Sequence, residues 1–391
     1  MYKKLSIFQQ NYLVLILLIL LVGIPSYIIY QYRVMSPTNN DYETHLSIVQ
    51  TYLTNEPVPR SFLSHPILQL ALIGISWATA GIINFQEGLV ILLTGSNILL
   101  ALCIYLWFGD NKKPGSDWIR KFWAVTLTFV APIMILAAVD ERLYFGYIGL
   151  ANYHNPTIQL LRPFAVMLFI LTLRVFNHKK NPTWLIVCAA LLTIFTTLIK
   201  PNLTTCLIPA LIVLTIIFAI KKEKMDWRLC IFGFILPAIM ILSWQYSITY
   251  TDVMNTNKGI IFAPFIIDRN VSNYLLLKFF LSVFFPLIVL LVNNKILEHE
   301  NALKLSWLTF FAGTAQVYLF AEGGSDFKAG NFRWGAQIGL LLLFIASARF
   351  IFQQHTNLSM KEKMINYLTY LPHVAGGIVY FLYCLLTIYY E

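Results

Sequence analysis

The feature that most constrains this chain is a succession of long apolar segments that continues from near the N-terminus to near the C-terminus. A transmembrane helix needs about 20 predominantly apolar residues, because the hydrocarbon core of a bilayer is about 30 Å thick. Of the 391 residues, 58% are hydrophobic and only 12% are charged, whereas a soluble domain carries about 25% charged residues. The sequence therefore predicts an all-α, polytopic bundle of transmembrane helices that forms one domain over residues 1–391.

Apolar stretches of about 17–25 residues can be taken as spans, which gives about eleven transmembrane helices. We expect them near residues 12–32, 88–108, 122–139, 157–176, 184–199, 203–220, 229–248, 274–293, 305–321, 334–353 and 367–390. A further apolar stretch at 62–83 could also cross the membrane. We interpret it instead as a juxtamembrane helix on the outer surface, because Pro66 near its start and polar residues after its end suit an interfacial element.

The basic residues favour this interpretation. With 62–83 on the surface, the lysines and arginines of segments 179–180, 221–228 and 361–363 all become cytoplasmic, as the positive-inside rule requires. The N-terminus is then cytoplasmic and the C-terminus outside, with a first outer loop at 33–87 and further outer loops at 249–273 and 322–334. The net charge of +10 thus follows from topology, and nucleic acid is not an expected partner.

Polar side chains capable of chemistry concentrate on the outer side, whereas the cytoplasmic loops are short and offer mainly lysine and arginine. This asymmetry favours an enzyme that works on the non-cytoplasmic face. The candidate site residues are Asp41, Glu43, His45, His65, Asp140, Glu141, His154, Asn155, Arg162, Lys200, Arg269, Lys328 and Arg333.

The first outer loop offers a carboxylate beside an imidazole. Asp41, Glu43 and His45 alternate, so they share a face of an extended segment, and Asp41 and His45 lie one turn apart on a helix. A carboxylate in a lipid-bounded cavity can have a raised pKa and act as a general base on a hydroxyl or an amine. The alternative is an ordinary solvated loop with an Asp–His contact.

Cations at span ends are candidates for binding phosphate. Lys200 can hold a phosphate at the membrane surface or extend its ammonium toward lipid headgroups. The Arg333 guanidinium matches phosphate oxygens, and Lys328 precedes it in the same loop, although both could serve as interfacial anchors. Arg162 lies inside a span, so we expect it to face the protein interior or a wet cavity.

Asn155 precedes Pro156 at the start of the fourth span and can cap that helix. In that case His154 is left to contact substrate or Asp41.

This layout resembles the GT-C class of membrane glycosyltransferases. Asp41 occupies the place of the catalytic acid soon after the first span, and Ser64-His65-Pro66-Ile67 opens the expected juxtamembrane helix. Asp140-Glu141 resembles the second acidic position of these families, and Lys200-Pro201 resembles a basic position that contacts phosphate.

The resemblance implies transfer of a sugar from a polyprenyl-phosphate donor to a lipid-linked or cell-envelope glycan acceptor, usually with inversion. Asp41 would be the general base, and Lys200 and Arg333 would stabilise the departing phosphate. The first loop has no DxD motif, so a divalent metal is not implied. The expected location is a bacterial inner (plasma) membrane.

Two alternatives remain open. A polysaccharide polymerase or ligase of the cell envelope also uses outer-loop arginines, but it usually has a larger late outer loop than those expected here. A lipid or solute transporter would place polar residues at mid-membrane on several helices, accessible in turn from both sides.

Overall fold

The computed structural model describes residues 13–14, 16–36, 41–54, 56–58, 60–109, 116–140, 142–151, 153–177, 180–250, 259–293, 300–324, 327 and 329–387. Helices account for most of these residues, and the sheet in this part of the chain is one two-stranded ribbon. The expected all-α class is therefore confirmed. The expectations for Glu141 and Lys328 lie outside the described residues.

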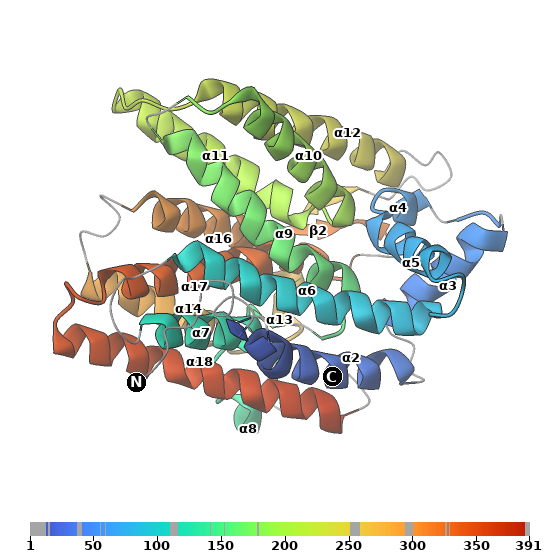
Figure 1. Ribbon diagram of the computed structural model, residues 1–391, viewed down its shortest axis with the longest axis horizontal. Helices are drawn as coiled ribbons and strands as arrows, with labels where there is room; N and C mark the ends of the chain where they lie inside the picture. The colour runs from blue at the N-terminus through green and yellow to red at the C-terminus, as the bar shows by residue number, and fades with distance from the viewer. Residues whose placement is uncertain are drawn as a thin grey trace, which may run out of the picture.

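The helices follow one another closely along the chain (Figure 1). The N-terminal half contains a π-helical segment Ile19–Gly23, α2 Ile24–Met35, α3 Asp41–Thr54, α4 Arg60–Leu63, α5 Ile67–Ala78, α6 Phe85–Phe108, α7 Ser116–Phe129, α8 Ala137–Asp140, α9 Pro156–Leu173 and α10 Thr183–Ile199. The C-terminal half contains α11 Asn202–Ile220, a π-helical segment Leu229–Ile235, α12 Leu236–Tyr250, β1 Ile260–Phe262, α13 Ile266–Arg269, α14 Leu275–Val292, α16 Asn301–Leu319, β2 Phe320–Glu322, α17 Arg333–Gln354 and α18 Met360–Leu386.

Eight helices among the described residues are long and apolar enough to cross a membrane. They are Ile16–Met35, Phe85–Phe108, Pro156–Phe176, Asn202–Ile220, Leu229–Tyr250, Leu275–Val292, Arg333–Gln354 and Met360–Leu386. Each matches one of the expected spans, so the chain is a multi-pass helical membrane protein. The count of eleven spans and the direction of insertion remain predictions.

The ambiguous stretch 62–83 is not one long helix. It contains the end of α4 and the 12-residue α5, which is about 18 Å long and so shorter than the bilayer core. A capping box then starts α6: the Glu87 backbone N–H donates to Asn84 Oδ1 at 2.9 Å, and the Asn84 N–H donates to Glu87 Oε2 at 3.2 Å. The stretch is therefore divided into short helices, and its position on the outer surface remains a prediction.

The expected helix over 122–139 is wrong in its second half. Helix α7 ends at Phe129, and an extended segment follows. Pro132 disfavours a helical conformation at the residue before it, and His373 of α18 binds the segment. The His373 carbonyl accepts from the Ala131 N–H at 3.2 Å, and its ring Nδ1 lies 3.0 Å from the Ala131 carbonyl. The ring Nε2 accepts from the Phe285 N–H at 3.3 Å, so His373 is a hydrogen-bonded interior residue.

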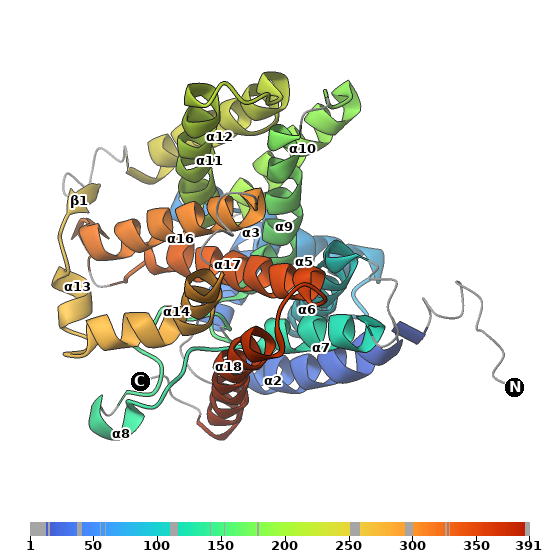
Figure 2. The same cartoon turned by 90° about the vertical axis from the view of Figure 1, so that its left-hand side faces the viewer.

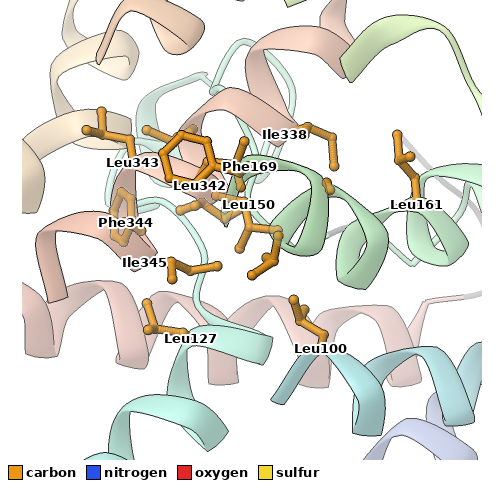
Figure 3. Packing of buried hydrophobic residues seen from close by; sticks show 14 of the residues in the cluster. Leu100, Leu127, Leu150, Leu161, Phe169, Ile338, Leu342, Leu343, Phe344 and Ile345 are labelled. Atoms are coloured by element: carbon orange, nitrogen blue, oxygen red, sulfur yellow. The ribbon is translucent and has the colours of Figure 1, made fainter. Parts of the chain in front are cut away.

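Helix α17 runs through the middle of the bundle in both views (Figures 1 and 2). It packs closely against α16 because a glycine of each helix faces the backbone of the other helix. A Cβ on Gly313 of α16 would lie 2.7 Å from the Ala336 nitrogen, and one on Gly339 of α17 would lie 2.9 Å from the Phe310 Cα. Small residues allow such close approach of membrane helices. Figure 3 shows apolar side chains of α17, among them Leu342 and Phe344, packed among side chains from other helices.

The elements that carry the first outer-loop candidates gather at one end of the bundle. Figure 1 shows α3, α4 and α5 together there, close to one end of α12. The ribbon of β1 and β2 is antiparallel, with Ile260 opposite Glu322. This ribbon brings residues near 260 and 322 into one place, although they are far apart in sequence.

Candidate functional site

A cavity of about 560 Å³ lies among these elements. Its lining comes from α3, α4, the α10–α11 junction, α12, the ribbon and the segment before α17. Five of the expected site residues line it, namely Asp41, His45, His65, Asn155 and Lys200. The cavity thus joins the first outer loop to positions more than one hundred residues later in the chain.

Asn155 connects Asp41 to Lys200. Its side-chain Nδ2 donates to Asp41 Oδ2 at 2.7 Å, and its Oδ1 lies 3.4 Å from the Lys200 ammonium. The same Oδ1 accepts from the Ile158 N–H at 3.1 Å, so Asn155 also caps α9 as expected. The hydroxyl of Thr157 completes the group, 3.1 Å from the Lys200 ammonium. The start of α9 therefore fixes the position of the Asp41 carboxylate.

The electrostatic setting of this group differs from that of a solvated loop. Burial raises the pKa of Asp41 above its ordinary value, while Lys200 and Asn155 oppose the rise. Burial also lowers the pKa of Lys200 to about 8, against the attraction of Asp41 and Glu322. The Lys200 ammonium additionally lies 5.3 Å from the centre of the Trp334 ring, a cation–π distance. A carboxylate with a raised pKa is a stronger base than an ordinary one, which suits it to take a proton from a substrate hydroxyl.

The two histidines of the cavity are neutral. Burial, followed by the charge of Lys200, lowers the pKa of His45 to about 3 and that of His65 to about 4. Gln69 Nε2 lies 2.9 Å from His45 Nδ1; since an amide nitrogen donates, Nδ1 accepts and the His45 proton sits on Nε2. Ser64 Oγ lies 2.8 Å from His65 Nδ1. Neutral imidazoles can bind hydroxyl groups without adding charge to the cavity.

A second polar group lines the cavity with Asp41 and Lys200. Glu322 accepts from the Tyr250 hydroxyl at 2.8 Å and from the side chain of Asn331. The Asn331 carbonyl accepts in turn from Asn202 Nδ2 at 2.9 Å. Nearby, Gln245 Nε2 donates to the Ser64 carbonyl at 2.6 Å and ties α12 to the start of the juxtamembrane segment.

Sequence reasoning missed this second group. Gln245 lies within the expected span at 229–248, Tyr250 in the expected outer loop at 249–273, and Asn202 directly before a span, and none of them was among the candidate residues. The available signal was the position of Glu322 and Asn331 in an expected outer loop.

Several expected site residues lie elsewhere. Glu43 and Arg269 are exposed and do not line the cavity. His154 packs beside the Trp334 ring, with 5.3 Å between ring centres. Arg333 forms an ion pair with Asp268 at 2.8 Å. The structure therefore places Arg333 against a buried carboxylate of α13 rather than in the lining of the cavity.

Arg162 lies in the interior of the bundle, as expected for a charge inside a span, but it does not line the cavity. Its guanidinium donates to the Thr128 carbonyl at 2.8 Å, to Gln159 Oε1 at 3.1 Å and to Asn97 Oδ1 at 3.4 Å. The Thr128 carbonyl belongs to the last turn of α7, where helix carbonyls lack partners within the helix. These contacts make Arg162 a cap for α7.

Asp140 is also held away from the cavity. It forms a buried ion pair with Lys278 of α14 and accepts from the Ser272 hydroxyl at 2.7 Å. Burial opposes its ionisation, but the hydrogen bonds from Lys278 and Ser272 outweigh burial and lower its pKa. This pair fastens α8 to α14.

Among the described residues, no group of three or more His, Cys, Asp or Glu side chains is arranged to hold a metal ion. No family model matches this chain, and no curated protein matches it either. A functional assignment therefore depends on the chemistry of the cavity.

Proposed function

We propose that this protein is a membrane glycosyltransferase of the GT-C type. It would move a sugar from a polyprenyl-phosphate donor to a lipid-linked or cell-envelope glycan acceptor on the non-cytoplasmic face, with Asp41 as general base. The observation that carries the proposal is the position of Asp41: its carboxylate lines a 560 Å³ cavity, is fixed by Asn155, and lies in the electrostatic field of Lys200.

The proposed reaction uses one base and one cation. Asp41 takes the proton of an acceptor hydroxyl while the hydroxyl oxygen attacks the anomeric carbon of the donor. The bond between that carbon and the phosphate oxygen breaks, and its electron pair leaves with the phosphate. The ammonium of Lys200 stabilises the additional negative charge on the phosphate. A base with a raised pKa suits this step, because general-base catalysis is most effective when the pKa lies near the working pH.

The dimensions and lining of the cavity support a sugar-phosphate ligand. Its volume of about 560 Å³ lies in the range of small-molecule sites, about 300–1,000 Å³. Neutral donors such as the His45 Nε2–H can bind sugar hydroxyls. The transporter alternative predicts substrate-binding polar residues within the spans, whereas Arg162, a buried cation of the long helix Pro156–Phe176, donates to carbonyl and amide oxygens of the protein.

The test is a transfer assay on the full chain in lipid nanodiscs. Radiolabelled undecaprenyl-phosphate hexoses would be supplied with a lipid-linked glycan extract, and release of undecaprenyl phosphate and labelling of the extract would be measured. Asp41→Asn should reduce transfer by about 10²–10⁴-fold, the usual contribution of a general base. Glu56→Gln is the matched control, because Glu56 is exposed and does not line the cavity. Transfer that survives Asp41→Asn at the wild-type rate would show that the base is wrongly assigned.

A further inference from the structure

Glu322 is held in place by three other segments of the chain. It ends β2, where it pairs with Ile260 of β1, and the next residue, Gly323, donates its N–H to the Gly259 carbonyl at 2.7 Å. Its neighbour Ala321 is buried. Tyr250 at the end of α12 and Asn331 before α17 then bind its two oxygens. The orientation of this carboxylate is therefore fixed before any ligand arrives.

The contacts of Glu322 leave it able to accept more hydrogen bonds. Each of its oxygens accepts one bond from a neutral donor, while a carboxylate oxygen can accept about two. Within the described part of the chain, the ion pairs do not include Glu322. A carboxylate placed in a cavity with unused acceptor capacity is suited to a ligand that brings hydrogen-bond donors.

The surroundings of Glu322 match the shape of a sugar. Tyr246, Ile260 and Phe332 line the cavity with it, and their apolar surfaces can cover the C–H faces of a hexose ring. Lys200 is attracted to both Asp41 and Glu322, and all three side chains line the same cavity. A single sugar phosphate can therefore contact Lys200 through its phosphate and Glu322 through its hydroxyls.

We propose that Glu322, oriented by Tyr250 and Asn331, is the group that recognises the hydroxyls of the transferred sugar and so selects which sugar is used. This inference rests on the proposed glycosyltransferase function and deepens it, since it assigns the sugar end of the donor to one side of the cavity. The ligand class is a neutral hexose with a hydroxyl directed at Glu322.

The experiment measures binding rather than transfer. The probes are short-chain prenyl-phosphate glucose, its mono-deoxy analogues, its 2-amino analogue and the bare prenyl phosphate, with affinities measured by competition on the full chain in nanodiscs. Loss of a hydroxyl bound to a carboxylate should weaken binding by about 10- to 100-fold for one deoxy analogue. Glu322→Gln should reduce that discrimination to within about 3-fold, and it should not weaken the binding of bare prenyl phosphate, because it removes a negative charge that acts on Lys200.

Two further variants keep the result interpretable. Tyr250→Phe removes one of the two donors that orient Glu322 and should reduce the discrimination by a smaller factor. Glu56→Gln removes an exposed carboxylate outside the cavity and should leave the discrimination between the sugar analogues unchanged. Thermal midpoints of all variants report whether they fold.

The outcomes separate the inference from the proposed function. Unchanged discrimination in a folded Glu322→Gln variant would overturn the assignment of Glu322, while binding of prenyl-phosphate glucose would still support the function. Tighter binding of the 2-amino analogue, lost in Glu322→Gln, would make Glu322 an amine-binding group and overturn the hydroxyl assignment. Absence of binding by both prenyl-phosphate glucose and bare prenyl phosphate to the wild-type protein would overturn both.

Discussion

The Asn155 side chain both caps α9 and donates a hydrogen bond to Asp41. Two different replacements of Asn155 can therefore separate the effect on stability from the effect on the ionisation of Asp41. Its Oδ1 accepts from the Ile158 N–H at 3.1 Å and caps the helix, while its Nδ2 donates to Asp41 Oδ2 at 2.7 Å. Asn155→Ala loses both bonds. Asn155→Asp keeps an oxygen for the cap, since aspartate is as good a cap as asparagine, but loses the donor to Asp41.

The expected magnitudes differ for the two functions of this side chain. Loss of the cap should destabilise the protein by about 1 kcal/mol. A hydrogen bond to a charged group contributes about 1.5–3 kcal/mol, and one pKa unit corresponds to about 1.4 kcal/mol. Because Asp41 is only partly buried, the lower end of this range applies, and Asn155→Ala should raise the pKa of Asp41 because its ionised form loses a hydrogen bond.

The sign of the effect on activity follows from the role of a base. Asp41 must be ionised to accept a proton, so activity rises with pH through its pKa. A higher pKa therefore moves the acidic limb of the kcat/KM profile to higher pH. Asn155→Asp should move this limb further than Asn155→Ala, because two carboxylates in contact disfavour ionisation of one another. The same repulsion destabilises the folded protein where both carboxylates are ionised, so its stability should stay near that of the wild type only below the acidic limb, where the pair keeps a proton.

The assay is the pH profile of kcat/KM for an undecaprenyl-phosphate hexose, with the thermal midpoint of each variant measured in parallel. The expected pattern is a shift of the acidic limb in both variants and, at pH values below that limb, a lower thermal midpoint in Asn155→Ala alone. An acidic limb that stays at the wild-type pH in both variants would refute the link between Asn155 and the ionisation of Asp41.

Two further predictions concern the cations. The pKa of Lys200 is lowered to about 8, so transfer should fall as pH rises through about 8. Lys200→Arg should remove this alkaline limb of the pH profile, because arginine stays protonated. An alkaline limb that persists at the same pH in this variant would assign the limb to another group. Arg162→Met should destabilise the protein by about 2–4 kcal/mol, because buried carbonyl and amide oxygens lose their donor, while KM for the donor stays unchanged. A raised KM with unchanged stability would instead place Arg162 at the substrate.

The parts of the fold that follow from local composition could be predicted from the sequence. A span is recognised from its own apolar residues, so the eight long helices match expected segments. Asn155 before Pro156 was likewise readable as a helix cap, because capping is a contact between residues close in sequence. The segment 130–134 was not predictable in the same way. Its composition is that of a span, and its extended form depends on Pro132 together with hydrogen bonds from His373.

The residues of the candidate site could likewise be predicted where they depend on local sequence and not where they depend on tertiary contacts. Asn155 and Lys200 could be proposed because each lies at the end of an apolar segment, where a polar residue stands out, and Asp41 because it lies in the outer loop expected after the first span. The partners of Arg333 and Asp140 could not, since Asp268 and Lys278 are distant in sequence and reach them only through tertiary packing. A cation at a span end can meet a protein carboxylate as readily as a substrate phosphate, and sequence position alone does not distinguish the two.

The arrangement of charge around Lys200 explains how a single cation could assist the proposed transfer. Before reaction, the ammonium lies in the field of the Asp41 carboxylate, which supports its protonation. As Asp41 takes the acceptor proton it becomes neutral, and an equal negative charge develops on the departing phosphate. The attraction of Lys200 for Asp41 is thus replaced by attraction for the phosphate, and the net charge of the cavity does not change. Only interactions that strengthen in the transition state accelerate a reaction, and Lys200 meets that condition because its first partner loses its charge as the second gains it.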